Sequence, residues 1–495
     1  ISRRGNKIVI DWINDVQLFS SYEERVNYME AWEMGCDHRL MLLLRKSQIC
    51  YSIKIIKIII KISVAEITKR EGNYITIEHT FDLRGDMLET EENIMMANNE
   101  IGLLATKEKL EKYDADGSGI KLGSVIMSSK GKIKKDYETP FGTVSVERYI
   151  YQGNKGGETY CPLDENARII TSSTPRLAKL VSSKYAKLSV RDVIFDIEES
   201  HGRKFTKGYI QKTAETISAI AQIKEEKWEY DIPKVKEEVK VITFSIDGAM
   251  VRMGEEGYRE VMSGSIALYG EDEKGERKRL HTIYIAASPE YGKAKFFKKM
   301  QREMEITKRL YPSSKYVAVA DGAKDNWKFL EPHVDYKILD FYHATEYLSY
   351  LSYAYHPKDD KLRKEWQATM CHKLKYDLHA AKDILSEMEK LKKDNKLTKL
   401  ILENLQKAIT YFTNNLTRMN YWEHIKSNLP IGSGVTEAAC KVVVKQRLCN
   451  SGMQWKEFGI KTVLSLRTLI LTKDRWQQYW AKINQYGVIK PVSSH

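Results

Sequence analysis

Three apolar, β-branched runs followed by alternating helical and strand patterns restrict the fold of this chain more than any other feature. The three runs cover residues 240–250, 260–270 and 279–287. The segments after them alternate between helix and strand, over 292–311, 315–322, 325–334, 335–343 and 344–356. The order β-β-β-α-β-α-β-α predicts an α/β fold, a mixed sheet with helices packed on its faces.

Two of these predicted strands are followed by an aspartate. Asp247 comes where the apolar residues of the first run stop, after Ile246, and Asp321 comes after the Val-Ala-Val-Ala run at 317–320. Neighbouring strands would bring the two carboxylates together at one edge, where like charges are unfavourable unless a cation lies between them. Glu437 opens a helix after a glycine turn and can reach the same place. Three hard oxygen ligands suit Mg²⁺ or Mn²⁺, whereas the alternative for Asp247 is an ordinary turn-opening role.

A pair of helical patterns precedes the strand region. Within 174–223, one amphipathic helix is predicted to end near Gly202, and Thr206 is predicted to cap a second. Two short helices joined by a tight polar turn are typical of a helix-turn-helix, whose second helix contacts DNA. The alternative is a plain helical hairpin packed against the next domain. The side chains placed on the second helix are Lys207, Tyr209, Gln211 and Lys212.

Other segments complete the predicted organisation. A helix over 87–110 and a small β-hairpin within 137–152 come first. The charged region 357–427 is helical in pattern and is predicted to be an insertion folded apart from the sheet, with Glu423, the rival third acid, on it. The predicted units are an uncertain amino-terminal segment (1–85), a helix and hairpin domain (86–173) and the helix-turn-helix region (174–235). They continue with the first part of the core (236–356), the insertion (357–428) and the last part of the core (429–495).

Charge and cysteine content restrict the partners and the compartment. The 495 residues carry a formal net charge of +13 spread along the chain, which favours nucleic acid over a membrane as partner. Six cysteines without a CxxC pair favour a reducing cytoplasm over a disulfide framework or a zinc site. The apolar run at 53–62 is interrupted by lysines and is too short to span a bilayer.

Several separated motifs occur in one order along the chain. They read SIDGAMVRM, VADGAKDNW, ILDFYHATEYL and PIGSGVTEAACKVVVKQRLCNSGMQW. With these motifs the chain resembles the bacterial insertion-sequence transposases of the Kra group, relatives of the Mutator-like DDE transposases with a ribonuclease H-like catalytic core. Two upstream segments, TPFGTVSVERYIYQGNKGGETYCPLDE and ESHGRKFTKGYI, resemble the same family, so the similarity covers residues 90–475.

The resemblance implies a set of site residues. Asp247 would be the first catalytic acid, Asp321 the second and Glu437 the third, together holding two Mg²⁺ or Mn²⁺ ions. The DFYH stretch matches an acid-x-x-His motif of the family, which gives Asp340 and His343 a supporting role. A structural histidine is the alternative for His343.

Further residues are expected to contact DNA. Lys441, Lys445 and Arg447, on or just after the Glu437 helix, would face phosphates near the metals, with a solvated helix face as the alternative. Trp455 could stack on a displaced base, although a role in the core is the commoner one for a tryptophan.

The function implied is that of a cytoplasmic bacterial transposase, associated with the nucleoid when it is bound to DNA. It would bind double-stranded DNA at the element ends and at the target, and catalyse metal-dependent cleavage and strand transfer. Synapsis of two ends implies a homodimer or a higher oligomer. One alternative is a ribonuclease H-like nuclease or resolvase without strand transfer. Another is a non-catalytic, domesticated DNA-binding derivative, against which the presence of all three acids argues.

Overall fold

The computed structural model describes residues 2–4, 7–9, 65–154, 156–225, 227–233, 235–289, 293–393, 397–432 and 434–488. The chain divides into two compact units, residues 1–105 and 106–495. Most of the predicted uncertain segment 1–85, including the run at 53–62, lies outside the described residues.

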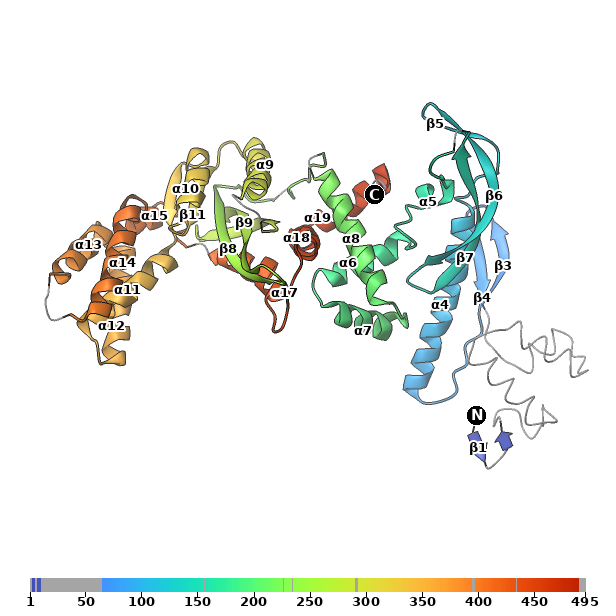
Figure 1. The fold of residues 1–495 in the computed structure, drawn as a ribbon, viewed down its shortest axis with the longest axis horizontal. Coiled ribbons are helices and arrows are strands. Elements are labelled where there is room, and N and C mark those ends of the chain that lie inside the picture. Colours follow the sequence, from blue (N-terminus) through green and yellow to red (C-terminus); the bar gives the residue numbers. More distant parts are fainter. Residues whose placement is uncertain are drawn as a thin grey trace, which may run out of the picture. The chain divides into compact units, whose positions relative to one another are not determined.

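The first unit contains two small antiparallel pairs and the start of a long helix (Figure 1). The helix α4 confirms the helix predicted over 87–110. The elements are β1 Ser2–Arg4, β2 Lys7–Val9, β3 Glu66–Glu71, β4 Tyr74–Glu78 and α4 Met87–Glu111.

A mixed five-stranded sheet forms the centre of the second unit. Its strand order is β10-β9-β8-β11-β12. The first three strands along the chain pair antiparallel, whereas β11 pairs parallel with both β8 and β12. The predicted order β-β-β-α-β-α-β-α is therefore confirmed. The elements are β8 Val241–Met253, β9 Gly257–Glu271, β10 Arg277–Ala287, α9 Ala294–Leu310, β11 Lys315–Ala320, α10 Lys324–Leu330, β12 Tyr336–Leu339 and α11 Phe341–Tyr355.

The two faces of the sheet bury different partners because side chains alternate along each strand. On one face, Phe244 and Ile246 of β8 pack in a cluster with Phe296 of α9 and Trp327 of α10. On the other face, Val317 of β11 packs in a second cluster with α11 and the helices that follow it.

Two strand boundaries differ from the prediction. β8 continues past Asp247 to Met253, because β9 pairs with it along this whole length. The predicted strand ended at residue 250, so the apolar pattern stops at Asp247 but the strand does not. The strand predicted over 335–343 ends at Leu339, because the Asp340 side chain accepts a hydrogen bond from the Tyr342 backbone N–H and caps α11.

The helical insertion is confirmed as helical, but it does not fold apart from the sheet. Leu405 and Phe412 of α14 belong to the same buried cluster as Val317 and Val319 of β11. The apolar side of α14 is covered by α11 and α13, and this packing continues to β11 as one buried core. The elements are α12 Asp360–Tyr376, α13 Ala380–Leu391, α14 Lys399–Asn415 and α15 Tyr421–Lys426.

The helical region before the sheet has the predicted boundaries. Helix α7 ends at Gly202, whose left-handed φ of 62° suits glycine, and the Thr206 hydroxyl accepts a hydrogen bond from the Tyr209 N–H at the start of α8. This region shares one buried cluster with the carboxy-terminal helices, including Ile217 of α8 and Leu464 of α18. The elements are α6 Pro175–Tyr185, α7 Val190–His201, α8 Lys207–Lys224, α18 Glu457–Leu471 and α19 Arg475–Tyr486.

The predicted β-hairpin is present but longer than expected. It turns at Thr139, whose N–H donates to the Gly142 carbonyl, and it extends back into a lysine-rich strand that lacks clean alternation. Val144 and Val146 of the hairpin are buried. The elements are β5 Ile120–Leu122, β6 Val125–Glu138, β7 Thr143–Gly153 and α5 Pro162–Asn166.

The acid-bearing segment after the insertion is shorter and less regular than one helix. A six-residue α-helix leads into a π-helical turn, which displaces the backbone by one residue from regular helix geometry. The elements are α16 Gly434–Ala439, the π-helical turn Cys440–Lys445 and α17 Gln446–Leu448. In the described part of the chain, no helix combines the length and the apolar character needed to cross a membrane.

Candidate active site

Asp247 lies on β8, and Asp321 directly follows β11, the parallel neighbour of β8. The pairing of β11 with β8 sets Ala318 opposite Phe244. The same register continued by three residues sets Asp321 opposite Asp247. Partners in register point to the same face, so both carboxylates project toward the side of α11 and the insertion. The structure therefore brings together the two acids that the sequence singled out.

The pKa of the Asp247 carboxyl is raised above the value of an exposed aspartate. Burial raises its pKa, and the charge of Asp321 raises it further. Hydrogen bonds from the Cys440 thiol and from the Gly248 N–H, at 2.7 Å, lower it, as does His343. The carboxyl thus lies in a partly desolvated place beside another acid.

Asp321 is oriented by the loop that joins β11 to α10. Its carboxylate accepts hydrogen bonds from the Ala323 N–H at 3.1 Å and from the Asn326 side-chain amide at 3.3 Å. Its carbonyl accepts one from the Trp327 indole N–H at 2.6 Å. Asn326 is almost fully buried and was not predicted as a site residue. The feature of the sequence that could have identified Asn326 is its position, five residues after Asp321 and in the first turns of a short helix.

The two supporting residues of the DFYH stretch have different surroundings. Asp340 is 2% exposed, and the β11–β12 register continued by one residue sets it beside Asp321, but its side chain caps α11. His343 lies in the first turn of α11, with Nδ1 3.7 Å from the Glu346 carboxylate. His343 is close enough to Asp247 to lower the pKa of that carboxyl. His343 is thus within electrostatic range of Asp247, and Asp340 caps the helix that carries His343.

The chain after the insertion returns to the edge of the sheet. The Ile431 carbonyl accepts a hydrogen bond from the Phe341 N–H at 3.0 Å, directly after the capping Asp340. Gly432 packs so tightly on the ring of Tyr342 that a Cβ there would lie 3.0 Å from the ring. Glu437 follows on α16, but its side chain lies outside the described part of the chain. The rival Glu423 lies on α15, within the insertion as predicted.

Two residues beside Asp247 were not found from the sequence. The Cys440 side chain is 1% exposed, and burial, followed by the charge of Asp247, raises the pKa of its thiol well above the usual range. Ser263 lies opposite Asp247 on β9, is fully buried, and faces the same thiol. The β8–β9 register and the π-helical turn place these residues, and neither follows from a local pattern.

The residues expected to face phosphate near the acids divide into two groups. Lys441 and Lys445 are exposed on the π-helical turn, and Lys445 is close enough to Cys440 to affect the pKa of its thiol. Arg447 is instead 2% exposed. Its guanidinium donates to the Tyr185 carbonyl and lies 5.0 Å from the ring of Trp455. The expectation that Arg447 contacts phosphate is therefore wrong. Its side chain packs inside the protein, because the π-helical turn directs it toward the buried helical cluster.

Trp455 is also tied to the protein interior. Its indole N–H donates to the Leu448 carbonyl at 2.9 Å, and its backbone bridges to Met253 at the end of β8. The expected stacking on a displaced base is corrected to this packing role, which was the alternative for a tryptophan.

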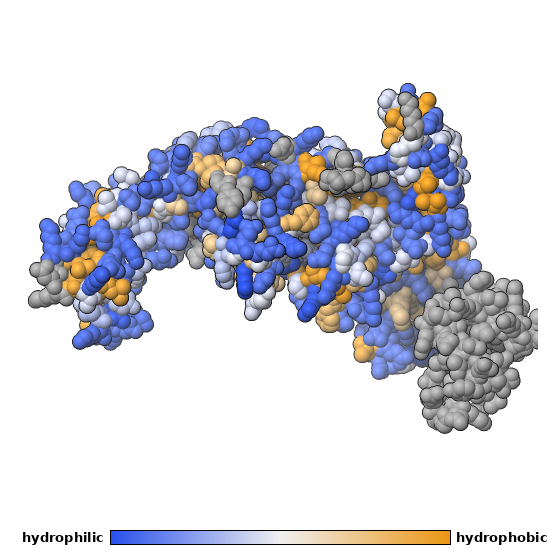
Figure 2. Space-filling model, in the orientation of Figure 1, coloured by the Kyte–Doolittle hydropathy of each residue, from blue (hydrophilic) through white to orange (hydrophobic). Residues whose placement is uncertain are grey.

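The predicted DNA-contacting helix α8 is exposed on one side only. Lys207, Gln211 and Lys212 are exposed there. Tyr209 is half-buried: its ring stacks on Phe205 at 4.7 Å and its hydroxyl is hydrogen-bonded to Ser173 at 2.5 Å. Tyr209 therefore packs the helix in place, and the lysines remain available to a ligand. The visible surface over this part of the chain mixes hydrophilic side chains with apolar patches (Figure 2).

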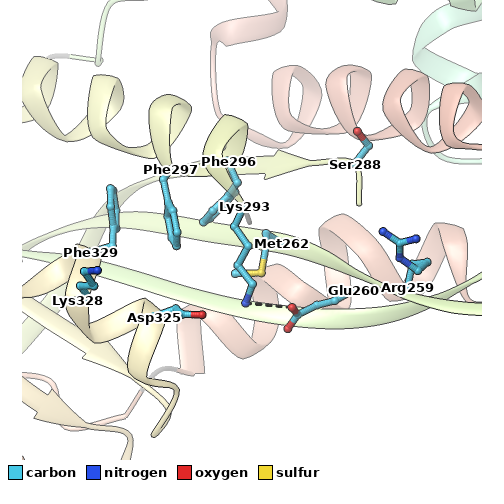
Figure 3. A pocket seen from close by; sticks show the side chains of 10 residues that line it. All are labelled: Arg259, Glu260, Met262, Ser288, Lys293, Phe296, Phe297, Asp325, Lys328 and Phe329. Carbon is cyan, nitrogen blue, oxygen red and sulfur yellow. Dashed lines mark ion pairs between the residues drawn. The ribbon is translucent and has the colours of Figure 1, made fainter. Parts of the chain in front are cut away.

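A cleft of about 790 Å³ lies on the opposite face of the sheet (Figure 3). Glu260 points into it and forms an ion pair with Lys293 at 3.0 Å, while the rings of Phe297 and Phe329 stack at 4.5 Å. Glu260 lies against Gly248, where a Cβ would collide with its carboxylate. Because Gly248 and Asp247 are consecutive residues of one strand, Glu260 and Asp247 lie on opposite faces.

The donor atoms beside Asp247 suit a hard divalent cation. Two carboxylates in register, one with a pKa raised partly by the other, form a pair that a cation would stabilise. Within the described residues, no group of three or more His, Cys, Asp or Glu side chains is arranged to hold a metal ion. The residues that fit the implied ion are thus Asp247 and Asp321, with α16 as the element that could add a third ligand.

Comparisons with known proteins add little to this geometry. No protein-family model matches the chain, and no curated protein matches it. One similar solved structure is the crystal structure of the Prototype Foamy Virus Protease-Reverse Transcriptase (native). The identity is 10%, the match covers 67% of this chain and 43% of that chain, and the TM-score is 0.14. The chain thus spans less than half of that protein, and a likeness this low relates neither fold nor function.

Proposed function

We propose that this chain is a DDE-type transposase that cleaves and joins DNA with a divalent metal ion, using Asp247 and Asp321 as its first two acids. The observation that carries the proposal is that Asp321 directly follows β11, the parallel neighbour of the strand that carries Asp247, and that the charge of Asp321 raises the pKa of the Asp247 carboxyl. The proposal also rests on the resemblance of the motifs around them to the Kra-group transposases.

The proposed core is ribonuclease H-like. Three meandering antiparallel strands followed by two parallel strands with intervening helices match the order expected for that core. Neighbouring parallel strands end at one edge of the sheet, which is where such folds bind their ligands. The insertion that packs beside the second acid supports a transposase over a simpler nuclease of the same fold.

The proposed metal ion is Mg²⁺ or Mn²⁺, and two such ions would suit phosphoryl transfer. When bound, they stabilise negative charge on a phosphoryl group and favour in-line displacement. Asp247 and Asp321 would hold them, and Glu437 is the proposed third ligand. The Gly248 N–H orients Asp247, while the Ala323 N–H and Asn326 orient Asp321.

The proposed DNA contacts come from exposed lysines. Lys441 and Lys445 are exposed on the π-helical turn that follows α16 and suit the backbone of the reacting strand. Lys207 and Lys212 on α8 suit double-stranded DNA at the element end. A homodimer or higher oligomer follows from the need to hold two ends together.

The test uses the full chain with labelled duplexes that carry the ends of its own element, and a target plasmid. Asp247→Asn and Asp321→Asn should each abolish Mg²⁺-dependent cleavage and leave end binding intact, because the amide keeps the shape and removes the charge. Glu260→Gln is the matched control, since it lies on the opposite face and should keep cleavage. Wild-type cleavage by the Asp247→Asn protein would defeat the proposal.

The same assay separates the alternatives. Cleavage without joining to the plasmid would indicate a nuclease or resolvase. End binding without cleavage by the wild-type chain, in either Mg²⁺ or Mn²⁺, would indicate a non-catalytic DNA-binding derivative.

A further inference from the structure

Arg418, in the short 3₁₀ turn Leu416–Arg418 of the insertion, contacts the segment that follows Asp321. Its guanidinium donates hydrogen bonds to the Glu331 carboxylate at 2.6 Å and to the Asn415 side-chain oxygen at 3.1 Å. The same guanidinium lies 4.5 Å from the centre of the Trp327 ring. Trp327 is on α10, and Glu331 directly follows that helix. One side chain of the insertion therefore contacts the α10 segment at two places.

Trp327 carries this contact to the backbone of Asp321. Its indole N–H donates to the Asp321 carbonyl at 2.6 Å. Trp327 is 3% exposed and packs in the buried cluster that includes α9, while the Arg418 guanidinium lies over its ring. Two consecutive contacts, each between named groups, thus connect the insertion to the second acid.

The backbone after Asp321 depends on such support. Gly322 is the next residue, and a glycine restricts its own backbone less than any other residue does. The Ala323 N–H and the Asn326 amide hold the Asp321 carboxylate, whereas the Trp327 indole holds the Asp321 carbonyl. A shift of the indole would therefore turn the peptide between Asp321 and Gly322 and move the carboxylate.

An arginine suits this contact better than a lysine. Its planar guanidinium can stack on an indole and donate to two acceptors in fixed directions at the same time. The side chains of Arg418 and Glu331 are 19% and 33% exposed, so solvent screens their ion pair only in part. The hydrogen bond from Arg418 lowers the pKa of the Glu331 carboxyl, which keeps this partner charged.

We propose that Arg418 is a positioning residue, which acts through Trp327 to hold the β11–α10 loop in the conformation in which Asp321 binds the divalent ion. This inference rests on the proposed function. It makes the geometry of the second acid depend on the insertion. It differs from a structural role, in which Arg418 only ties the insertion to α10 and metal affinity is independent of it.

The test measures Mn²⁺ binding by titration calorimetry on the full chain without DNA, so the readout does not depend on cleavage. Arg418→Gln should weaken Mn²⁺ binding by about fivefold, within the range for a residue that acts on a site through another residue. Arg418→Lys keeps the charge but not the planar group, and it should recover part of the affinity. Wild-type Mn²⁺ affinity in a folded Arg418→Gln protein would overturn the inference.

A double-mutant cycle separates positioning from a structural role. Trp327→Phe removes the indole N–H that holds the Asp321 carbonyl and should weaken Mn²⁺ binding by itself. If Arg418 acts through Trp327, adding Arg418→Gln to Trp327→Phe should cause little further loss, because both changes break the same connection. Fully additive losses of affinity would show that Arg418 does not act through Trp327 and would overturn the inference.

Arg475→Gln is the matched control. Arg475, on α19, also forms an ion pair with a glutamate, Glu303, and lies 5.2 Å from an aromatic ring, that of Tyr230. Its replacement should lower the melting temperature, as Arg418→Gln does, and leave Mn²⁺ affinity unchanged. Equal weakening of Mn²⁺ binding by the two replacements would indicate a general loss of stability and would overturn the positioning role.

A milder pair of variants covers the case in which Trp327→Phe or Arg418→Gln does not fold. Arg418→Lys and Glu331→Gln each keep a hydrogen-bonding group in the same place, so they change the contact without emptying it. Both should weaken Mn²⁺ binding measurably, and wild-type affinity in both would overturn the inference.

The failure of the proposed function gives a different result. If the wild-type chain bound no Mn²⁺, or if Asp321→Asn bound it unchanged, the metal site itself would be wrong and the positioning role would fall with it. Mn²⁺ binding that requires Asp321 but is indifferent to Arg418 would overturn the positioning role alone.

Discussion

Gly322 lies directly under the ring of Tyr411, and a Cβ on the glycine would be 2.5 Å from the Tyr411 Cε2 atom. Gly322 follows Asp321, whereas Tyr411 lies on α14 of the insertion and stacks on Tyr347 of α11 at 3.9 Å. The charge of Asp321 contributes to a raised pKa of Tyr411, of which burial is the main cause. The insertion therefore forms one wall of the candidate active site.

Replacing this glycine should disturb both stability and the site. Gly322→Ala forces Tyr411 to move and should cost about 1–3 kcal/mol in the free energy of unfolding, the usual range for overpacking. Metal-dependent cleavage should fall with it, since Asp321 is the next residue. Chemical denaturation and the cleavage assay measure the two effects. Gly208→Ala is the control, because a Cβ there meets nothing within 4 Å; equal stability of both variants would contradict the close contact.

The raised pKa of Asp247 predicts that this carboxylate destabilises the metal-free protein. A carboxyl whose pKa is raised on folding favours the folded state at low pH, and this contribution is lost as the pH rises from the ordinary value of 3.8 through the raised one. Asp247→Asn should therefore raise the melting temperature at neutral pH without metal. Mg²⁺ should stabilise the wild-type chain and not the variant.

Calorimetric melting with and without Mg²⁺ checks this expectation, with Glu260→Gln as the control on the opposite face. The contradicting result would be a metal-free Asp247→Asn protein that melts well below the wild type. It would show that the folded protein stabilises the charged Asp247 carboxylate and does not destabilise it.

A buried histidine on β10 predicts acid sensitivity. His281 is 6% exposed, and burial, followed by Arg475, lowers its pKa to about 4. The unfolded chain binds a proton near pH 6.5 and the folded chain does not, so stability is lost as the pH falls from 6.5 toward 4. The loss should amount to roughly 1–3 kcal/mol. Urea denaturation across this range should show a weaker pH dependence for His281→Gln, and an unchanged dependence would exclude this histidine as the cause.

The guanidinium of Arg467 predicts a large cost for a conservative replacement. Burial lowers the pKa of Arg467 to about 10, yet its donors reach carbonyls on both α6 and the π-helical turn. A lysine has one charged nitrogen and cannot serve all of them. Arg467→Lys should therefore lower the free energy of unfolding by about 2–4 kcal/mol. Arg191→Lys on the exposed side of α7 is the control and should change it little; a similar loss in both would point to a general effect of the replacement.

Exposed lysines on α8 predict a salt-dependent contribution to DNA binding. Changing Lys207 and Lys212 to Ala should weaken end binding and reduce the slope of log affinity against log salt by about one unit for each lost phosphate contact. Fluorescence anisotropy at several salt concentrations measures the slope. Lys274→Ala, at an exposed turn between β9 and β10, should leave it unchanged. An unaltered slope in the α8 variant would favour a helical hairpin that only packs on the carboxy-terminal helices.

Local signals account for the parts of the fold that could be predicted. The apolar runs and their alternation with helical periods identify the order of strands and helices. Gly202 and Thr206 mark helix ends through backbone conformation and capping, which depend on a few neighbouring residues. The strand ends predicted at residues 250 and 343 were wrong. Pairing with β9 extends β8 to Met253, and the Asp340 side chain begins α11 directly after Leu339.

The part of the candidate site that could be predicted also depends on local sequence signals. Asp247 and Asp321 follow apolar strand patterns, so their meeting could be inferred from the sequence. Arg447 and Trp455 look like surface residues on a basic segment, and their burial depends on how α17 packs against α6 and β8. Cys440 and Ser263 have no local signal, since each acquires its meaning from a residue far away in the chain.

By itself, the sequence determined which elements form and in what order, together with the two acids that follow apolar runs, because these depend on hydrophobic period and local backbone preference. Tertiary structure alone decided the register that sets Asp247 against both Asp321 and Ser263, the packing of the insertion on the sheet, and the burial of Arg447. The physical reason is that strand register and side-chain burial are set by the pairing of distant segments, whose free energy no local stretch of residues contains.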